Sequence, residues 1–249
     1  MTDNRISGKK IEIDSKSVSD FFENRVKAFN PDHPLTAVLY QDSNPSIAEG
    51  RDAHEKKIAL PLLELTGKES LLDIGCGIGR WAEVLKGDLH NYCGIDFCGG
   101  LIDLAKKSCV AGNVKFLVAG AEDVASKQVI DEGPFNRFII SGLMIYLNET
   151  QIIKMLQGIF TVADDNAQIY IREPLAVSER LTLDKFWSDE LSSSYSAIYR
   201  TQEELRDLIK LAFGDKSVSE FEFKPVYAEE SLNNRKETRQ YYTVIRFKN

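Results

Sequence analysis

The pattern of apolar and polar positions divides the chain into a helical beginning and an alternating remainder. Up to about Leu65, apolar residues recur at helical spacing, as in SVSDFFENRVKAF, and the polar stretch NPDHP interrupts them. A second helix is predicted to begin at Pro45 or Ser46 and to be bent or divided at Pro61. We therefore expect residues 1–65 to form a helical segment that covers the rest of the molecule as a lid.

Short apolar runs that resemble buried strands alternate with helix-like segments in the next part of the chain. The strand candidates are Ser70–Ile74, Asn91–Asp96, Val114–Ala119, Phe135–Ser141 and Ala167–Arg172. This alternation is typical of a parallel sheet covered by helices on both faces. Two later runs, VSEFEFKPVY and RQYYTVIRF, are joined by a polar stretch and predict an antiparallel edge. The expected fold of residues 66–249 is α/β, with a seven-stranded, mostly parallel sheet.

The alternation lapses in residues 175–200, which are rich in Ser, Leu and aromatic residues, and we expect an irregular insertion there. Thr201, with Glu204 three positions later, has the spacing of a capping box and predicts the start of a helix. The acidic run Asp164-Asp165-Asn166 could suggest a metal site, but its place before a strand favours a turn. No metal is predicted.

Composition narrows the possible functions. The 249 residues are 43% hydrophobic, enough for one sizeable core. The net charge is −7, which argues against binding to nucleic-acid phosphates. The four cysteines have neither paired spacing nor a histidine cluster, so they are interpreted as buried thiols. No signal segment or run of about 18 apolar residues is present, and a cytoplasmic protein with no membrane partner is predicted.

The stretch LLDIGCGIGRW places three glycines directly after the first strand and before a helix, where a nucleotide-binding loop would lie. A dinucleotide fingerprint needs a further glycine three positions after Gly77, and Arg80 stands there instead. Asp73, two residues before the first glycine, would repel a pyrophosphate and suits a cationic amino-acid group. These features disfavour a dinucleotide oxidoreductase.

The glycine stretch resembles the first motif of class I S-adenosylmethionine-dependent methyltransferases, which have a Rossmann-like fold. In that family an acid at the end of the second strand binds the ribose hydroxyls, and Asp96 stands there, followed by Phe97. The family's third motif usually reads like GDAE. This chain has GAED, so Ala121 and Glu122 are the expected contacts to the adenine. The resemblance implies these cofactor-binding residues: Asp73, Gly75, Cys76, Gly77, Gly79, Arg80, Asp96, Phe97, Ala121, Glu122, Ser141, Gly142 and, from the lid, Tyr40.

Tyr40 could equally belong to the core of the lid, and Arg80 could pair with a nearby acid rather than with the cofactor. Stretches such as YQDSNPSIAEGRDAHEK, YIREPL and AIYRTQEE resemble methyltransferases found beside capsule and natural-product biosynthesis genes. Related enzymes build a substrate cap from the region that corresponds to residues 175–200. The expected substrate-binding residues are therefore Arg180, Tyr195, Tyr199 and Arg200 of this region, together with Arg172 at the carboxyl end of the fifth strand.

Methyl transfer needs a base only when the attacking group is protonated at neutral pH. The candidate catalytic residues are Glu173, at the carboxyl end of the fifth strand, and His33, in the lid. Either Arg172 or Glu173 could touch the substrate while the other makes a structural ion pair. The predicted reaction is methyl transfer from S-adenosylmethionine to an oxygen, less favourably a nitrogen, of a small polar metabolite such as a saccharide or phosphorylated precursor. The alternative is a non-catalytic cofactor-binding regulatory or scaffold subunit.

Overall fold

The computed structural model describes residues 4–214, 218–227, 232–233 and 235–247. Its elements are, in chain order, β1 (Arg5–Ser7), α1 (Ser15–Lys27), α2 (Thr36–Leu39), α3 (Pro45–Leu62), β2 (Ser70–Ile74), α4 (Ala82–Leu85), β3 (Asn91–Asp96), α5 (Gly99–Ser108), β4 (Val114–Val118), η1 (Ala121–Asp123), α6 (Lys127–Ile130), β5 (Phe135–Ser141), η2 (Met144–Tyr146), α7 (Glu149–Val162), β6 (Ala163–Ala176), β7 (Leu181–Ser188), β8 (Ser193–Tyr199), α8 (Gln202–Phe213), β9 (Lys224–Pro225) and β10 (Thr238–Arg246).

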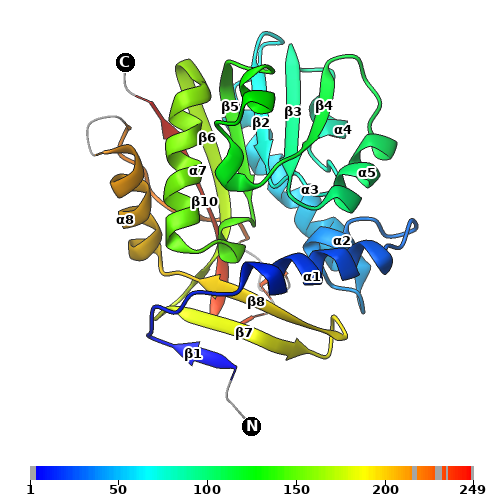
Figure 1. Cartoon of the computed structure of the whole chain (residues 1–249), viewed down its shortest axis with the longest axis vertical. Helices are drawn as coiled ribbons and strands as arrows, with labels where there is room; N and C mark the ends of the chain where they lie inside the picture. The colour runs from blue at the N-terminus through cyan, green and yellow to red at the C-terminus, as the bar shows by residue number, and fades with distance from the viewer. Residues whose placement is uncertain (1–3, 215–217, 228–231, 234, 248–249) are drawn as a thin grey trace.

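A seven-stranded sheet in the order β4-β3-β2-β5-β6-β10-β9 forms the centre of the molecule (Figure 1). Neighbouring strands from β4 to β6 are parallel, and β10 is antiparallel to both β6 and β9. The predicted α/β fold, with a mostly parallel sheet and an antiparallel C-terminal edge, is confirmed. The strand order reverses between β2 and β5, and the crevice beyond the carboxyl ends of such strands is where open α/β sheets bind ligands.

Apolar side chains of successive strand residues point to opposite faces of this sheet, and each face has its own core. Leu72 and Ile74 of β2 pack in the cluster that includes buried residues of α7 and α8. Leu71 packs in a second cluster, with residues of α3, α4 and α5 on the other face. Because side chains alternate along a strand, Asp73 lies on the same face as Leu71. This alternation decides which residues near the glycine loop can reach a ligand.

A second, three-stranded sheet in the order β1-β7-β8 lies with α1 across one end of the main sheet (Figure 1, bottom). All its pairings are antiparallel. The prediction of an irregular insertion in residues 175–200 is wrong, because β7 and β8 form a hairpin there. The N-terminal segment contains the helices α1, α2 and α3, but it also has a strand that was not predicted, because Arg5–Ser7 pairs with Leu181–Leu183. The apolar faces of α1 and this hairpin pack together in a third cluster, which explains the aromatic residues of the insertion.

The helix boundaries follow recognisable local signals. Asp14 caps α1, since its side chain accepts a hydrogen bond from the Lys16 amide at 2.9 Å. Thr201 and Glu204 form the predicted capping box of α8. Pro61 neither bends nor divides α3 as predicted, because it stands in the last turn and the helix ends one residue later.

The acidic run before the fifth parallel strand was predicted to be a turn, and that prediction is wrong. Asp164-Asp165-Asn166 belongs to the start of β6, where the pairing register with β5 shifts and Asn166 has a φ of 62°. A bulge of this kind lets the strand continue while its acidic side chains stay exposed. In the described part of the chain, no group of three or more His, Cys, Asp or Glu residues could hold a metal ion. Within the same residues, no helix is long and apolar enough to cross a membrane.

Candidate active site

The glycine loop leaves the carboxyl end of β2 with a backbone that only glycine adopts easily. Gly75, Gly77 and Gly79 have φ values of 74°, 55° and 76°. A Cβ atom on Gly75 would lie 2.9 Å from Leu143 Cδ1, and one on Gly77 would lie 2.8 Å from Val38 Cγ1. The glycines thus allow both a left-handed backbone and close packing against the segments that surround the crevice.

Asp96, the last residue of β3, ties the glycine loop to the neighbouring strand. Its Oδ2 accepts a hydrogen bond from the Gly77 amide at 3.0 Å, and its Oδ1 accepts one from the Cys98 amide at 2.9 Å. Burial raises the pKa of Asp96 to about 6, although the two amide donors oppose this shift. An ionised carboxylate has about four acceptor positions, so lone pairs remain for hydroxyl groups of a ligand.

A cavity of about 340 Å³ opens beside Asp96, between the main sheet and α1. It lies at the carboxyl ends of β2, β3, β4 and β5, where the strand order reverses. Gln151 Nε2 donates to Glu122 Oε2 at 2.7 Å and fixes this carboxylate at the rim. Eight residues of the predicted cofactor set line this larger cavity: Gly75, Gly77, Asp96, Phe97, Ala121, Glu122, Ser141 and Gly142.

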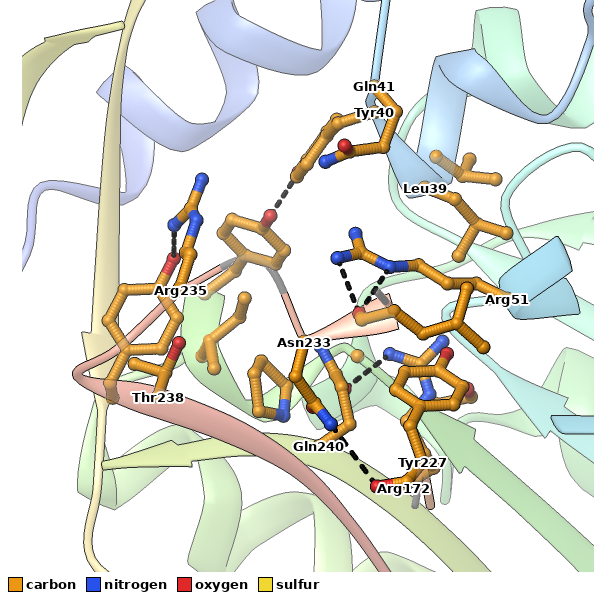
Figure 2. A pocket seen from close by; sticks show the side chains of 18 residues that line it. Leu39, Tyr40, Gln41, Arg51, Arg172, Tyr227, Asn233, Arg235, Thr238 and Gln240 are labelled. Carbon is orange, nitrogen blue, oxygen red and sulfur yellow. Dashed lines mark hydrogen bonds between the residues drawn. The ribbon is translucent and has the colours of Figure 1, made fainter. Parts of the chain in front are cut away.

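A smaller cavity of about 100 Å³ adjoins the larger one. Both are lined by the same four residues, Val38, Ser141, Gly142 and Tyr146, so molecules bound in the two cavities would meet at this boundary. Figure 2 shows how side chains from the lid, from β6 and from the segment before β10 surround the smaller cavity. Its further lining residues are Leu39, Tyr40, Gln41, Arg51, Ile145, Arg172, Pro174, Tyr199, Tyr227, Leu232, Asn233, Arg235, Thr238 and Gln240.

Two tyrosines from distant parts of the chain meet at the boundary. The Tyr40 and Tyr146 hydroxyl groups form a hydrogen bond with each other. Burial raises the pKa of each phenol well above its ordinary value. Both hydroxyl groups therefore remain protonated at neutral pH. They can orient a ligand through hydrogen bonds, but they do not provide a ready base.

Comparison with known proteins agrees with this geometry. A family model described as a methyltransferase domain matches residues 71–166. These residues run from β2 into β6 and include the glycine loop, Asp96 and the segment after β5. This part of the chain is similar to a methyltransferase domain. This match supports the prediction of a methyltransferase at the level of the domain.

The similar proteins include methyltransferases that are named for a small molecule, phosphoethanolamine. Phosphoethanolamine N-methyltransferase 1 of Triticum aestivum is 25% identical over 150 residues, which are 59% of this chain and 30% of the wheat protein. The structure of the Haemonchus contortus enzyme of the same name, with phosphoethanolamine and S-adenosylhomocysteine, has a TM-score of 0.65 at 17% identity and covers 94% of this chain. N-methyltransferase NodS of Bradyrhizobium japonicum, also with S-adenosylhomocysteine, has a TM-score of 0.59 at 12% identity and covers 94% of this chain and 100% of NodS. The chain spans only half the length of the Haemonchus protein.

Four residues of the predicted cofactor set line neither of the two cavities: Asp73, Cys76, Gly79 and Arg80. Asp73 faces the side of the sheet covered by α3, α4 and α5, and its Oδ2 accepts a hydrogen bond from the Tyr92 hydroxyl at 2.5 Å. Burial raises the pKa of Asp73 to about 7. This acid supports the glycine loop from behind.

Arg80 lies in a buried network of charges below the boundary between the cavities. Its guanidinium donates to Asp52 and to Glu55, each at 2.8 Å, and to Ser141 Oγ at 2.7 Å. Glu55, on α3, also accepts hydrogen bonds from Arg172 Nη2 at 3.0 Å and from the Ser141 hydroxyl at 2.6 Å. Both acids that pair with Arg80 therefore come from α3.

The predicted substrate residues divide into two groups. Arg172 and Tyr199 line the smaller cavity. Tyr40, which was predicted to bind the cofactor, also lines this cavity. Arg180 instead pairs with Glu149 at 3.0 Å and with Glu204 at 3.4 Å. The last two residues line neither cavity: Tyr195, whose hydroxyl accepts from Arg235, and Arg200, which donates to the carbonyls of Met144 and Leu147.

Neither predicted catalytic residue lies at the boundary between the cavities. Glu173 is buried beneath it, and its Oε1 accepts hydrogen bonds from the amides of Leu143 and Met144 at 2.8 and 2.9 Å. Burial raises the pKa of Glu173 to about 7. His33 is exposed, and its Nδ1 lies 3.4 Å from Glu49. These positions suit residues that support the backbone and the surface of the lid.

Sequence reasoning missed Arg235 and Gln240, which line the smaller cavity. A topological signal could have found both of them. Because β10 is antiparallel, its first residues lie at the carboxyl ends of the parallel strands. The segment just before β10 therefore adjoins the ligand site, and it contributes Asn233 and Arg235 to the lining.

Proposed function

We propose that the chain transfers the methyl group of S-adenosylmethionine to a small molecule that enters the smaller cavity. The observation that carries this proposal is the shared boundary of the two cavities at Ser141, Gly142 and Tyr146. Displacement at a methyl group requires the attacking atom and the sulfonium group to be held in line, which two adjoining chambers achieve. In the reaction the carbon–sulfur bond breaks and a new bond forms to the acceptor.

The proposed binding of the cofactor uses the residues around the larger cavity. The Asp96 carboxylate accepts hydrogen bonds from the ribose hydroxyls, and the segment of Ala121 and Glu122 borders the adenine. The glycine loop and Ser141 border the amino-acid end. S-adenosylmethionine supplies the activated methyl group, and the chain orients it and excludes water.

For the acceptor atom, we propose an amine nitrogen. Among the described residues that line the smaller cavity, no carboxylate or imidazole is present. A sugar hydroxyl would need such a base, whereas an amine can lose its proton to water before it attacks. Three similar proteins also have N-methyltransferase names. The oxygen acceptor favoured by the sequence remains the alternative, and an oxygen that is already ionised would equally need no base.

The test is methyl transfer from labelled S-adenosylmethionine to four acceptors in two matched pairs: phosphoethanolamine and ethanolamine, and glucose 6-phosphate and glucose. Mass spectrometry locates the added methyl group. We expect an N-methylated product from an amine and no product from either sugar. A sugar ether would contradict the nitrogen assignment. Cofactor binding without transfer to any small acceptor, including those of a cell extract, would favour the non-catalytic subunit.

A further inference from the structure

Three arginines from distant parts of the sequence line the smaller cavity. Arg51 comes from α3, Arg172 from near the end of β6, and Arg235 from the segment before β10. In Figure 2 Arg235 lies on one side of the cavity, and Arg51 and Arg172 lie on the other. The described lining of this cavity contains no acidic side chain. The cavity therefore has a concentration of positive charge that the composition of this acidic chain does not suggest.

Each guanidinium is held in place by groups of the chain. Arg51 donates from Nε and Nη2 to the Leu232 carbonyl, at 3.2 and 2.9 Å. Arg235 donates to the Tyr195 and Tyr199 hydroxyls at 3.1 and 2.9 Å. The Leu232 carbonyl and the two tyrosine hydroxyls are neutral hydrogen-bond partners, and the charge of Glu190 acts on both guanidinium groups.

Arg172 is held more firmly and lies at the boundary with the larger cavity. Its Nη1 donates to Gln240 at 3.2 Å, and its Nη2 donates to Glu55 at 3.0 Å. A Cβ atom on Gly142 would lie only 3.0 Å from Arg172 Nη1, so the guanidinium packs directly against this shared glycine. Arg172 thus lines the smaller cavity close to the glycine that the two cavities share.

The positive charges of Arg172 and Arg235 act on Arg51. Burial lowers the pKa of Arg51, and the charges of Arg172 and Arg235 lower it further, while Tyr227 and Glu190 oppose the shift. Like charges that are gathered in a partly buried cavity destabilise the free protein. A bound anion would relieve this repulsion and would form charge-assisted hydrogen bonds.

We propose that the smaller cavity binds the anionic group of the acceptor, a phosphate or a chemically similar oxyanion, among Arg51, Arg172 and Arg235. This inference rests on the proposed function and names the substrate class of the same site. The anion lies between arginines on opposite sides, which suits a tetrahedral group with oxygens in several directions. At about 100 Å³, the cavity is well below the ~300–1,000 Å³ of sites for drug-sized ligands. The acceptor is therefore a compact phosphorylated metabolite whose other end faces Tyr146.

The test measures binding of inorganic phosphate by calorimetry, with and without S-adenosylhomocysteine, at constant ionic strength. Arg51→Gln and Arg235→Gln each remove one guanidinium without leaving the buried Glu55 unpaired. We expect each to weaken phosphate binding by about 10- to 100-fold, since hydrogen bonds to charged groups are this strong. Arg246→Gln is the matched control, because Arg246 is exposed, pairs with Glu64, and lines neither cavity. This control should bind phosphate like the wild type.

Affinity for S-adenosylhomocysteine separates this inference from the proposed function. We expect the arginine variants to bind it normally, which also shows that they are folded. In turnover, phosphoethanolamine should be preferred over ethanolamine by the wild type, and this preference should fall in Arg51→Gln and Arg235→Gln. Phosphate binding that is absent in the wild type, or unchanged in both variants, overturns the anion site while leaving methyl transfer intact. Failure of the wild type to bind S-adenosylhomocysteine overturns the proposed function instead. In that case, phosphate binding measured in the absence of S-adenosylhomocysteine still tests whether Arg51 and Arg235 bind an anion.

Discussion

Replacing Asp96 with alanine is expected to weaken the binding of S-adenosylmethionine by about 100-fold or more. Its carboxylate is the buried acceptor proposed for the two ribose hydroxyls, and each charge-assisted hydrogen bond contributes about 1.5–3 kcal/mol. The same side chain accepts hydrogen bonds from the Gly77 and Cys98 amides, so its loss also releases the glycine loop. Calorimetric titration of the variant measures the change.

Two further variants show how much of this loss of affinity comes from the charge of Asp96 and whether the loss is specific to this carboxylate. Asp96→Asn keeps the size of the side chain and removes its charge, so it should show a smaller but clear loss of affinity. Asp103→Ala removes an exposed carboxylate from the neighbouring helix α5 and should bind the cofactor like the wild type. Affinity of Asp96→Ala within about threefold of the wild type would show that this carboxylate does not contact the ribose.

The pH dependence of binding provides a second measurement on Asp96. Burial raises its pKa to about 6 in the protein without cofactor. Hydroxyl donors of the ribose favour the ionised form, so affinity should rise as the pH increases through about 6 and should fall below it. We expect this dependence between pH 5 and pH 8 in the wild type and its disappearance in Asp96→Asn.

The second large effect is expected when Glu55 is replaced, and it concerns the stability of the folded protein. Glu55→Gln is expected to lower the free energy of unfolding by about 3–5 kcal/mol, the usual cost of breaking a buried ion pair from one side. Glu55 is fully buried and accepts hydrogen bonds from Arg80, Arg172 and Ser141. Its replacement leaves two buried guanidinium groups without their shared carboxylate. Urea unfolding measures the loss, and Glu83→Gln, on the exposed face of α4, is the control that should leave the unfolding midpoint unchanged.

Acid titration tests the cause of this effect. Although burial would raise the pKa of Glu55, Arg172 and Arg80 lower it to about 2 from an ordinary value of 4.5. A carboxyl group whose pKa is lowered by folding stabilises the protein above the unfolded value, and this stabilisation is lost as the pH falls toward the folded value. The stability difference between the wild type and Glu55→Gln should therefore be full above about pH 4.5 and shrink toward pH 2. A difference independent of pH would contradict the ionic explanation.

Local signals were sufficient to predict the main sheet and the positions of the glycine loop and Asp96 at its edge. The strand boundaries of β2, β3 and β5 follow from short apolar runs, and the glycines after β2 need a backbone that the sequence itself indicates. The position of Asp96 follows because the ends of neighbouring parallel strands meet at one edge. Such features depend on residues that are close in sequence.

The acceptor side depends on contacts between segments far apart in the chain. Arg80 and Arg172 share Glu55, which lies on α3 and joins them only through tertiary packing. The hairpin of β7 and β8 was missed because its buried apolar residues face α1 rather than the main sheet, so strand–helix alternation gave no sign of it. Arg235 belongs to a polar connection whose importance appears only when the antiparallel direction of β10 is taken into account.

The measurement that tests the central claim most directly is calorimetric binding of S-adenosylmethionine, S-adenosylhomocysteine and NAD to the wild-type protein. The claim is that the larger cavity, with its GxGxG loop and Asp96, is the site of an adenosyl cofactor. We predict micromolar, one-to-one binding of both adenosyl compounds and no binding of NAD. No binding of either adenosyl compound, or tighter binding of NAD, would contradict the account.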